Sequence, residues 1–202
     1  WLGLLAALVG GAGMAMIHGV VVIRFRANQI ISGLAINLLA VGLCKFFLKQ
    51  VFHSSSNSSR VDGLPNLLPD ALQGVPILDD VLNGPLVILT VLLFIIVHQT
   101  IYRTPFGLRL RAVGEHPAAA ESLGVRVARV RYAAVAISGA LAGLGGAWLA
   151  FEQHQFSDDI SGGRGYIALA AMILGRWSPI GAALAAMLFG FAETFQIQLQ
   201  TV

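Results

Sequence analysis

The chain has 202 residues, of which 56% are hydrophobic and only 11% are charged, and its formal net charge is +3. Soluble domains average roughly 45–50% apolar and about 25% charged residues, so this composition excludes an ordinary soluble protein. The arginines stand beside apolar runs rather than in a basic patch with interleaved aromatics, which excludes a nucleic-acid partner.

Two apolar runs open the chain. Residues 2–23 are rich in glycine and alanine and are followed by Arg24 and Arg26, while residues 30–48 carry Asn37 near their middle. Each run has about the 18–20 residues that cross a bilayer as a helix. Both are predicted to be transmembrane helices, and the small residues of the first permit close helix approach.

The longest hydrophilic region is residues 50–84, which is rich in serine, proline and aspartate. Such residues punctuate loops, so a long loop is predicted here. Residues 85–102 and 132–151 form two further apolar runs of spanning length. The second of them contains two small-residue spacings, Gly139-x-x-x-Gly143 and Ala142-x-x-x-Gly146, which favour tight packing of membrane helices.

The C-terminal part contains a broken apolar pattern. Residues 166–175 are apolar but too few to cross, an Arg-Trp-Ser-Pro sequence follows them, and residues 180–197 form a last spanning run. The short run is either a re-entrant half-helix, which needs protein or a water-filled cavity around it, or a helix on the membrane surface. The fold class is therefore all-α, a polytopic transmembrane helix bundle forming one domain over residues 1–202.

The Lys and Arg residues predict the orientation of the bundle. Five successive crossings put eight of the thirteen cations on one side, mostly within residues 103–131, and five on the other, which also receives seven of the ten acids. Cytoplasmic loops carry the excess of Lys and Arg. We therefore expect residues 103–131 to be cytoplasmic and residues 50–84 to be an extracytoplasmic loop.

A short helix is predicted in the middle of the cytoplasmic loop. Pro117 suits a first helical position, the alanines after it are good helix formers, and Gly124 suits the position after a helix end. A helix of about two turns is marginal in water by itself, so a groove on a partner or on its own bundle would stabilise it. The alternative is a generic cytoplasmic loop whose arginines only set topology.

Few polar residues interrupt the predicted spans. Asn37 and Ser32 are candidate pathway residues, because an amide or hydroxyl can bond a polar solute; the alternative is hydrogen bonding between helices. Asn28 and Gln29 are weaker candidates in the turn before, where they would also cap the next helix. The histidines recur at no metal-site spacing, the single cysteine forms no internal disulfide, and no motif of an enzyme or ATP site occurs.

Four stretches carry a family resemblance. Residues 114–125, GEHPAAAESLGV, together with residues 28–40, 104–114 and 162–177, resemble permease subunits of bacterial ABC importers of the ribose/branched-chain amino acid class. The forms Asn-Gln-Ile-Ile-Ser-Gly and Gly-Arg-Trp are most similar to the branch for nucleosides or simple sugars. Family members are usually longer, with further spans at both ends, so the chain is expected to be a fragment.

The resemblance implies that the cytoplasmic loop contains a coupling helix that docks into an ATP-binding subunit. The coupling residues would be Gly114, Glu115, His116, Pro117, Ala118, Ala119, Ala120, Glu121, Ser122, Leu123, Gly124 and Val125.

It also implies the assembly and the activity. Two permease subunits, identical or different, would stand in the lipid bilayer of the bacterial inner membrane with ATP-binding subunits and an extracytoplasmic solute-binding protein. The chain itself would be no enzyme and would need no cofactor or metal. A nucleoside or related sugar-containing solute would pass by alternating access; ribose, another sugar or a branched-chain amino acid is the alternative. A membrane enzyme or scaffold is the alternative from another class.

Overall fold

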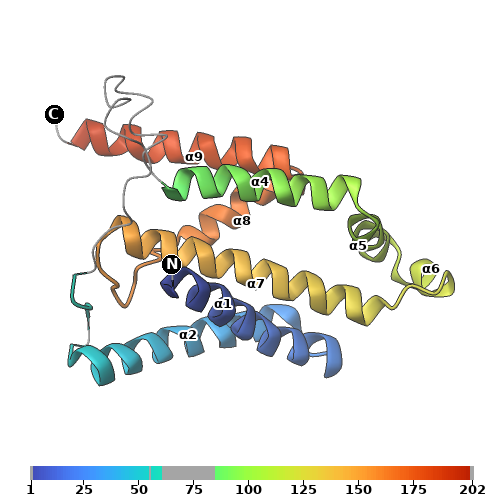
Figure 1. Ribbon diagram of the computed structural model, residues 1–202, viewed down its shortest axis with the longest axis horizontal. Coiled ribbons are helices and arrows are strands. Elements are labelled where there is room, and N and C mark those ends of the chain that lie inside the picture. Colours follow the sequence, from blue (N-terminus) through green and yellow to red (C-terminus); the bar gives the residue numbers. More distant parts are fainter. Residues whose placement is uncertain (1, 55, 61–84, 201–202) are drawn as a thin grey trace.

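The computed structural model describes residues 2–54, 56–60 and 85–200, and the regular elements of that part of the chain are all helical (Figure 1). Five helices are long and apolar enough to cross a membrane. They are α1 (Leu2–Gly19) with its π-helical end η1 (Val20–Arg24), α2 (Gln29–Phe52), α4 (Pro85–Arg103), α7 (Val127–Glu152) and α9 (Pro179–Gln200). The prediction of an all-α, multi-pass bundle is confirmed.

Helices α1 and α7 pack backbone against backbone. A Cβ atom at Gly139 would overlap the Gly11 carbonyl, and one at Gly143 would overlap the Ala7 carbonyl. Membrane helices gain little from burying apolar groups against each other, so such close contact supplies their attraction. The spacing Gly139-x-x-x-Gly143 is thus used as predicted, whereas a Cβ at Gly146 would meet nothing within 4 Å.

Two further helices, α8 (Arg164–Leu174) and α9, form a hairpin. Gly175 and Gly181 touch at its apex, where the Ser178 hydroxyl donates to the Gly175 carbonyl at 2.8 Å. At the other end, Arg164 Nη2 donates to Glu193 Oε1 at 3.0 Å, so the two helices are antiparallel. Packing of α8 along a helix of spanning length favours the re-entrant alternative over a helix on the membrane surface.

The direction of α9 differs from the expectation of five successive crossings. A helix of the length of α8 rises only about 16 Å, too little to cross the roughly 30 Å core. Arg176 and Trp177, with φ angles of +53° and +59°, then reverse the chain. Helix α9 therefore returns to the end of the bundle at which α8 begins (Figure 1).

At that end of the bundle, polar contacts join α2 and the segment after it to the turn after α7. The Ser58 amide donates to the Phe156 carbonyl at 2.8 Å, and Lys45 Nζ lies 3.6 Å from Asp158 Oδ2. Of the predicted loop over residues 50–84, only the beginning is described, since residues 61–84 lie outside the described part. The contacts bring the segment after α2 against the turn after α7.

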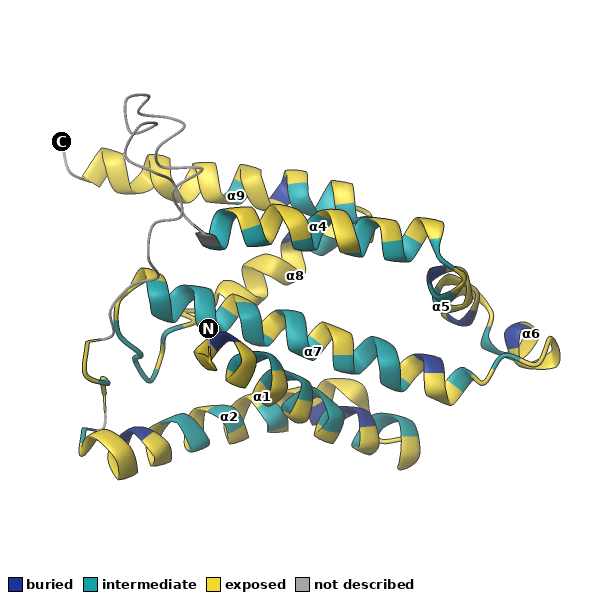
Figure 2. Ribbon diagram, in the orientation of Figure 1, coloured by how far each residue is buried: buried dark blue, intermediate teal, exposed yellow. Residues whose placement is uncertain are grey.

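Most large apolar side chains of α2 and α9 are exposed, whereas those of α7 are mostly half-buried (Figure 2). Phe191 and Met187 of α9 are 70% and 71% exposed, and Ile31 of α2 is 69% exposed. Lipid or other membrane helices can cover such surfaces without leaving backbone groups unpaired, because each helix satisfies its own. The buried hydrophobic cluster of the described residues lies instead at the end of the bundle, near α5 (Pro105–Glu115) and α6 (Pro117–Ser122).

Candidate functional site

Helix α5 (Pro105–Glu115) begins the candidate site by turning the chain sharply after α4, so that it lies crosswise to the ends of α4 and α7 (Figure 1). Thr104 caps it: its hydroxyl accepts from the Gly107 amide at 3.1 Å and donates to the Thr100 carbonyl at 2.6 Å. A Cβ at Gly107 would overlap the carbonyls of Thr100 and Ile101. Cap and glycine together hold α5 at this angle.

Helix α6 (Pro117–Ser122) follows with the boundaries that the sequence predicts. Pro117 is its first residue, and Gly124, at φ +81°, lies just past its end. The Val125 amide donates to the Ala120 carbonyl at 3.1 Å and so satisfies one of the free carbonyls at the helix end. At the other end, His116 Nδ1 accepts from the Ala119 amide at 3.2 Å and caps the helix.

A small hydrophobic cluster seats α6 on the bundle. Val113 of α5, Ala120 of α6 and Val130 of α7 are 4%, 4% and 8% exposed. Ala118 and Ala119 are exposed instead. The alanine surface of α6 is therefore divided, with Ala120 packed against its own chain and the other two free for a partner.

Of the predicted pathway residues, Gln29 lines a cavity and Ser32 contacts His18, which lines the same cavity. Ser32 is 7% exposed, and its hydroxyl lies 2.9 Å from His18 Nδ1, which joins α2 to α1. This cavity of about 440 Å³ is lined by His18, Gln29 and Arg131, and by Val113 and Gly114 of α5. Gly114, the first of the predicted coupling residues, and His18 near the end of α1 therefore border the same cavity.

The other two pathway candidates lie apart from this cavity. Asn28 caps α2: its Oδ1 accepts from the amides of Ile30 and Ile31 at 2.9 and 3.4 Å, the alternative role that its position allowed. Asn37 is exposed on α2. Among the described residues, no group of three His, Cys, Asp or Glu side chains is placed to hold a metal ion.

Comparison with known proteins identifies the family. Residues 1–202 match the family described as "Branched-chain amino acid transport system / permease component". The chain belongs to this permease family. The permease matches no solved structure.

Curated relatives sharpen the comparison. The permease is 40% identical over 201 residues to the guanosine ABC transporter permease protein NupQ of Bacillus subtilis and 37% identical over 201 residues to the nucleoside ABC transporter permease protein NupC of Lactococcus lactis. Each alignment covers 98% of this chain but 63% of the relative. A putative glucose ABC transporter permease protein, TsgC13 of Haloferax volcanii, is 31% identical over an alignment of 209 residues that covers all of this chain and 62% of the relative.

Sequence reasoning missed two functional contacts of the permease. The local sequence could have predicted the cap by His116, because His116 directly precedes Pro117, the first residue of α6. The bond between His18 and Ser32 has no local signal, because 14 residues separate the partners and only the packing of α1 against α2 brings them together.

Proposed function

We propose that this permease chain is part of an ATP-driven importer that translocates a nucleoside or related sugar-containing solute by alternating access. The observation that carries the proposal is the identity of 40% and 37% to guanosine and nucleoside permeases over 98% of the chain. ATP-binding subunits, a second permease subunit and an extracytoplasmic solute-binding protein complete the assembly in the bacterial inner membrane. The glucose relative makes a sugar the second candidate substrate.

In this proposal α6, within residues 114–125, receives the mechanical input. Its exposed Ala118 and Ala119 leave a flat surface that fits a groove of the ATP-binding subunit. Ala120 passes a displacement to Val113 and Val130, its neighbours in the buried cluster. Energy enters because the ATP-binding subunits contact α6 differently in their two states.

In this proposal, a displacement of α6 changes the shape of the cavity beside α5. Val113 belongs to the buried cluster and also lines the cavity that holds His18, Gln29 and Arg131. At about 440 Å³ the cavity is within the roughly 300–1,000 Å³ range of small-molecule sites, and its few polar groups suit the hydroxyls and base edges of a nucleoside. Ser32, Gln29, Asn28 and Asn37 remain the proposed pathway residues.

A bulky residue on the exposed face of α6 tests the coupling role. In the full-length permease assembled with its ATP-binding subunits, Ala119→Trp should lower ATP-dependent guanosine uptake at least tenfold, because the indole cannot enter a groove shaped for alanine. Ala112→Trp, at an exposed position of α5, is the matched control and should retain uptake. Wild-type uptake by the Ala119→Trp importer would contradict the coupling role.

A competition experiment tests the substrate separately. Uptake of labelled guanosine into proteoliposomes is measured with an excess of unlabelled nucleosides, ribose, glucose or leucine. We expect nucleosides to compete and leucine to have no effect. Competition by glucose or leucine without competition by nucleosides would overturn the substrate class and leave the coupling role standing. An Asn37→Ala importer with unchanged rate and selectivity would remove Asn37 from the pathway.

A further inference from the structure

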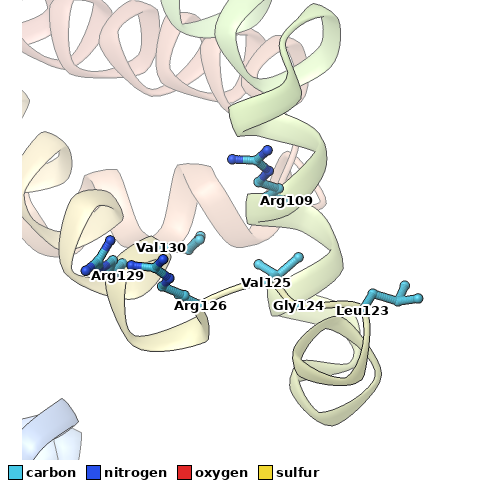
Figure 3. A pocket seen from close by; sticks show the side chains of 7 residues that line it. All are labelled: Arg109, Leu123, Gly124, Val125, Arg126, Arg129 and Val130. Atoms are coloured by element: carbon cyan, nitrogen blue, oxygen red, sulfur yellow. The ribbon is translucent and has the colours of Figure 1, made fainter.

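A second cavity, of about 450 Å³, lies between α5 and the start of α7. Three arginines line it, Arg109 from α5 and Arg126 and Arg129 from the start of α7, with Val130 as an apolar neighbour. Figure 3 shows Arg126 and Arg129 side by side, Arg109 on the helix opposite them, and Leu123 directed away from all three.

These arginines have no acidic partner within the described part of the chain. The ion pairs found there, Lys45–Asp158 and Arg164–Glu193, belong to other elements, and no acidic residue lines the cavity. Three guanidinium groups in one concave site repel one another and attract an anion. Their planar forks match phosphate oxygens in bidentate geometry.

The cavity lies at the end of the spanning helix α7. The spanning helix α7 begins at Val127, so Arg126 and Arg129 occupy the boundary of the span. Tyr132 follows within two turns, and tyrosines are enriched at membrane–water interfaces. Helix α5 lies crosswise to the ends of α4 and α7 (Figure 1), the direction that a helix along the membrane surface would take. In a bilayer crossed by α7, with residues 103–131 on the predicted cytoplasmic side, the three arginines would lie at the depth of the lipid headgroups.

The charges favour a lipid over an acidic surface of the ATP-binding subunit. The exposed residues of α6, the proposed contact with that subunit, include Glu121 and no Lys or Arg. The arginines stand instead on α5 and α7, which adjoin the span. The start of α7 has no side-chain cap, so its free amides add positive potential to the same cavity.

From this placement we propose that Arg109, Arg126 and Arg129 bind the phosphate of an anionic phospholipid in the cytoplasmic leaflet. The headgroup bridges α5 and α7, the two helices on which α6 is seated. Lipid binding thereby holds the seat of the coupling helix in place, and transport depends on anionic lipid. This goes beyond the choice of solute and does not rest on it.

Native mass spectrometry of the full-length permease with its ATP-binding subunits, in mixed micelles, tests the site. The wild type should retain phosphatidylglycerol in preference to phosphatidylcholine. Each arginine near an anionic lipid surface contributes about fivefold, so Arg126→Gln/Arg129→Gln should weaken phosphatidylglycerol retention roughly twentyfold. The double variant Arg24→Gln/Arg26→Gln removes the same charge from the same end, outside the cavity, and should retain the lipid within about twofold, because its charges act only at a distance.

Each contrary result has a definite meaning. Equal retention of phosphatidylglycerol and phosphatidylcholine by the wild type overturns the proposal without any variant. A cavity variant that keeps the lipid and loses the ATP-binding subunit assigns the arginines to that protein contact instead. Binding of inorganic phosphate without binding of phosphatidylglycerol also overturns it. Where the double variant does not fold, Arg109→Gln, which leaves α7 unchanged, decides by an expected fivefold loss.

Discussion

The contact between α1 and α7 and the seat of α6 on α5 and α7 use opposite means of packing. Between α1 and α7, Gly11, Gly139 and Gly143 bring backbone directly against backbone. At the seat, the side chains of Val113, Ala120 and Val130 are buried against one another. Between helices in lipid, burial of apolar groups gives little attraction, so close backbone contact must replace it. Where water surrounds short helices such as α6, the burial of apolar side chains stabilises their contact.

The difference bears on motion. Backbone contact leaves no room for a side chain and so admits essentially one geometry for α1 and α7. The seat consists of one six-residue helix and a few small side chains, so its rearrangement breaks few contacts. In the proposed coupling, the rigid pair α1 and α7 would move as a unit when a partner displaces the weakly held α6. Three substitutions, taken from the largest expected effect to the smallest, test this contrast.

Gly139→Leu should break the contact between α1 and α7. Even its Cβ would overlap Gly11 and Ala15, and neither backbone can yield without separating the helices. We expect less than a tenth of the wild-type amount of folded permease by fluorescence-detected size-exclusion chromatography. Gly145→Leu on the same helix is the control, because a Cβ there meets nothing within 4 Å. Equal recovery of the two variants would contradict the close contact.

Val113→Ala should loosen the seat of α6 and leave the spans intact. Loss of two buried methyl groups and the resulting cavity cost about 2 kcal/mol of local stability. Amides of α5 and α6 should exchange hydrogen faster, while those of α1 and α7 keep their rates. Leu108→Ala, at a side chain 62% exposed, is the control. Unchanged exchange in α6 would show that the cluster does not hold this helix.

Ser32→Ala should have the smallest effect, at the point where α2 meets α1. It removes the bond to His18, worth about 0.6–1 kcal/mol inside a membrane protein. Guanosine uptake should fall by no more than about fivefold, with a small decrease in thermal stability. Ser138→Ala, at an exposed position of α7, is the control and should change neither. A loss of uptake above a hundredfold with normal stability would show that the proposed pathway role of Ser32 outweighs its contact between the helices.

Local sequence predicted much of the structure of residues 103–131. Pro117 and Gly124 predicted the bounds of α6, because one residue lacks the amide that a helix start leaves free and the other tolerates the left-handed conformation at a helix end. The sequence does not show, however, which of the alanines between them is buried. Burial of Ala120 beside exposed Ala119 depends on where α5 and α7 stand, which no local pattern contains.

For the spanning helices, too, the sequence predicted some features and only the tertiary structure showed the others. The sequence by itself determined the spanning helices, since apolar length acts on each segment separately, and the placement of the arginines predicts a cytoplasmic position for residues 103–131. Only the tertiary structure decided that α9 returns beside α8, that Ser32 meets His18, and that three arginines from two helices line one cavity. These features depend on contacts between residues far apart in the chain, whose geometry follows from packing rather than from composition.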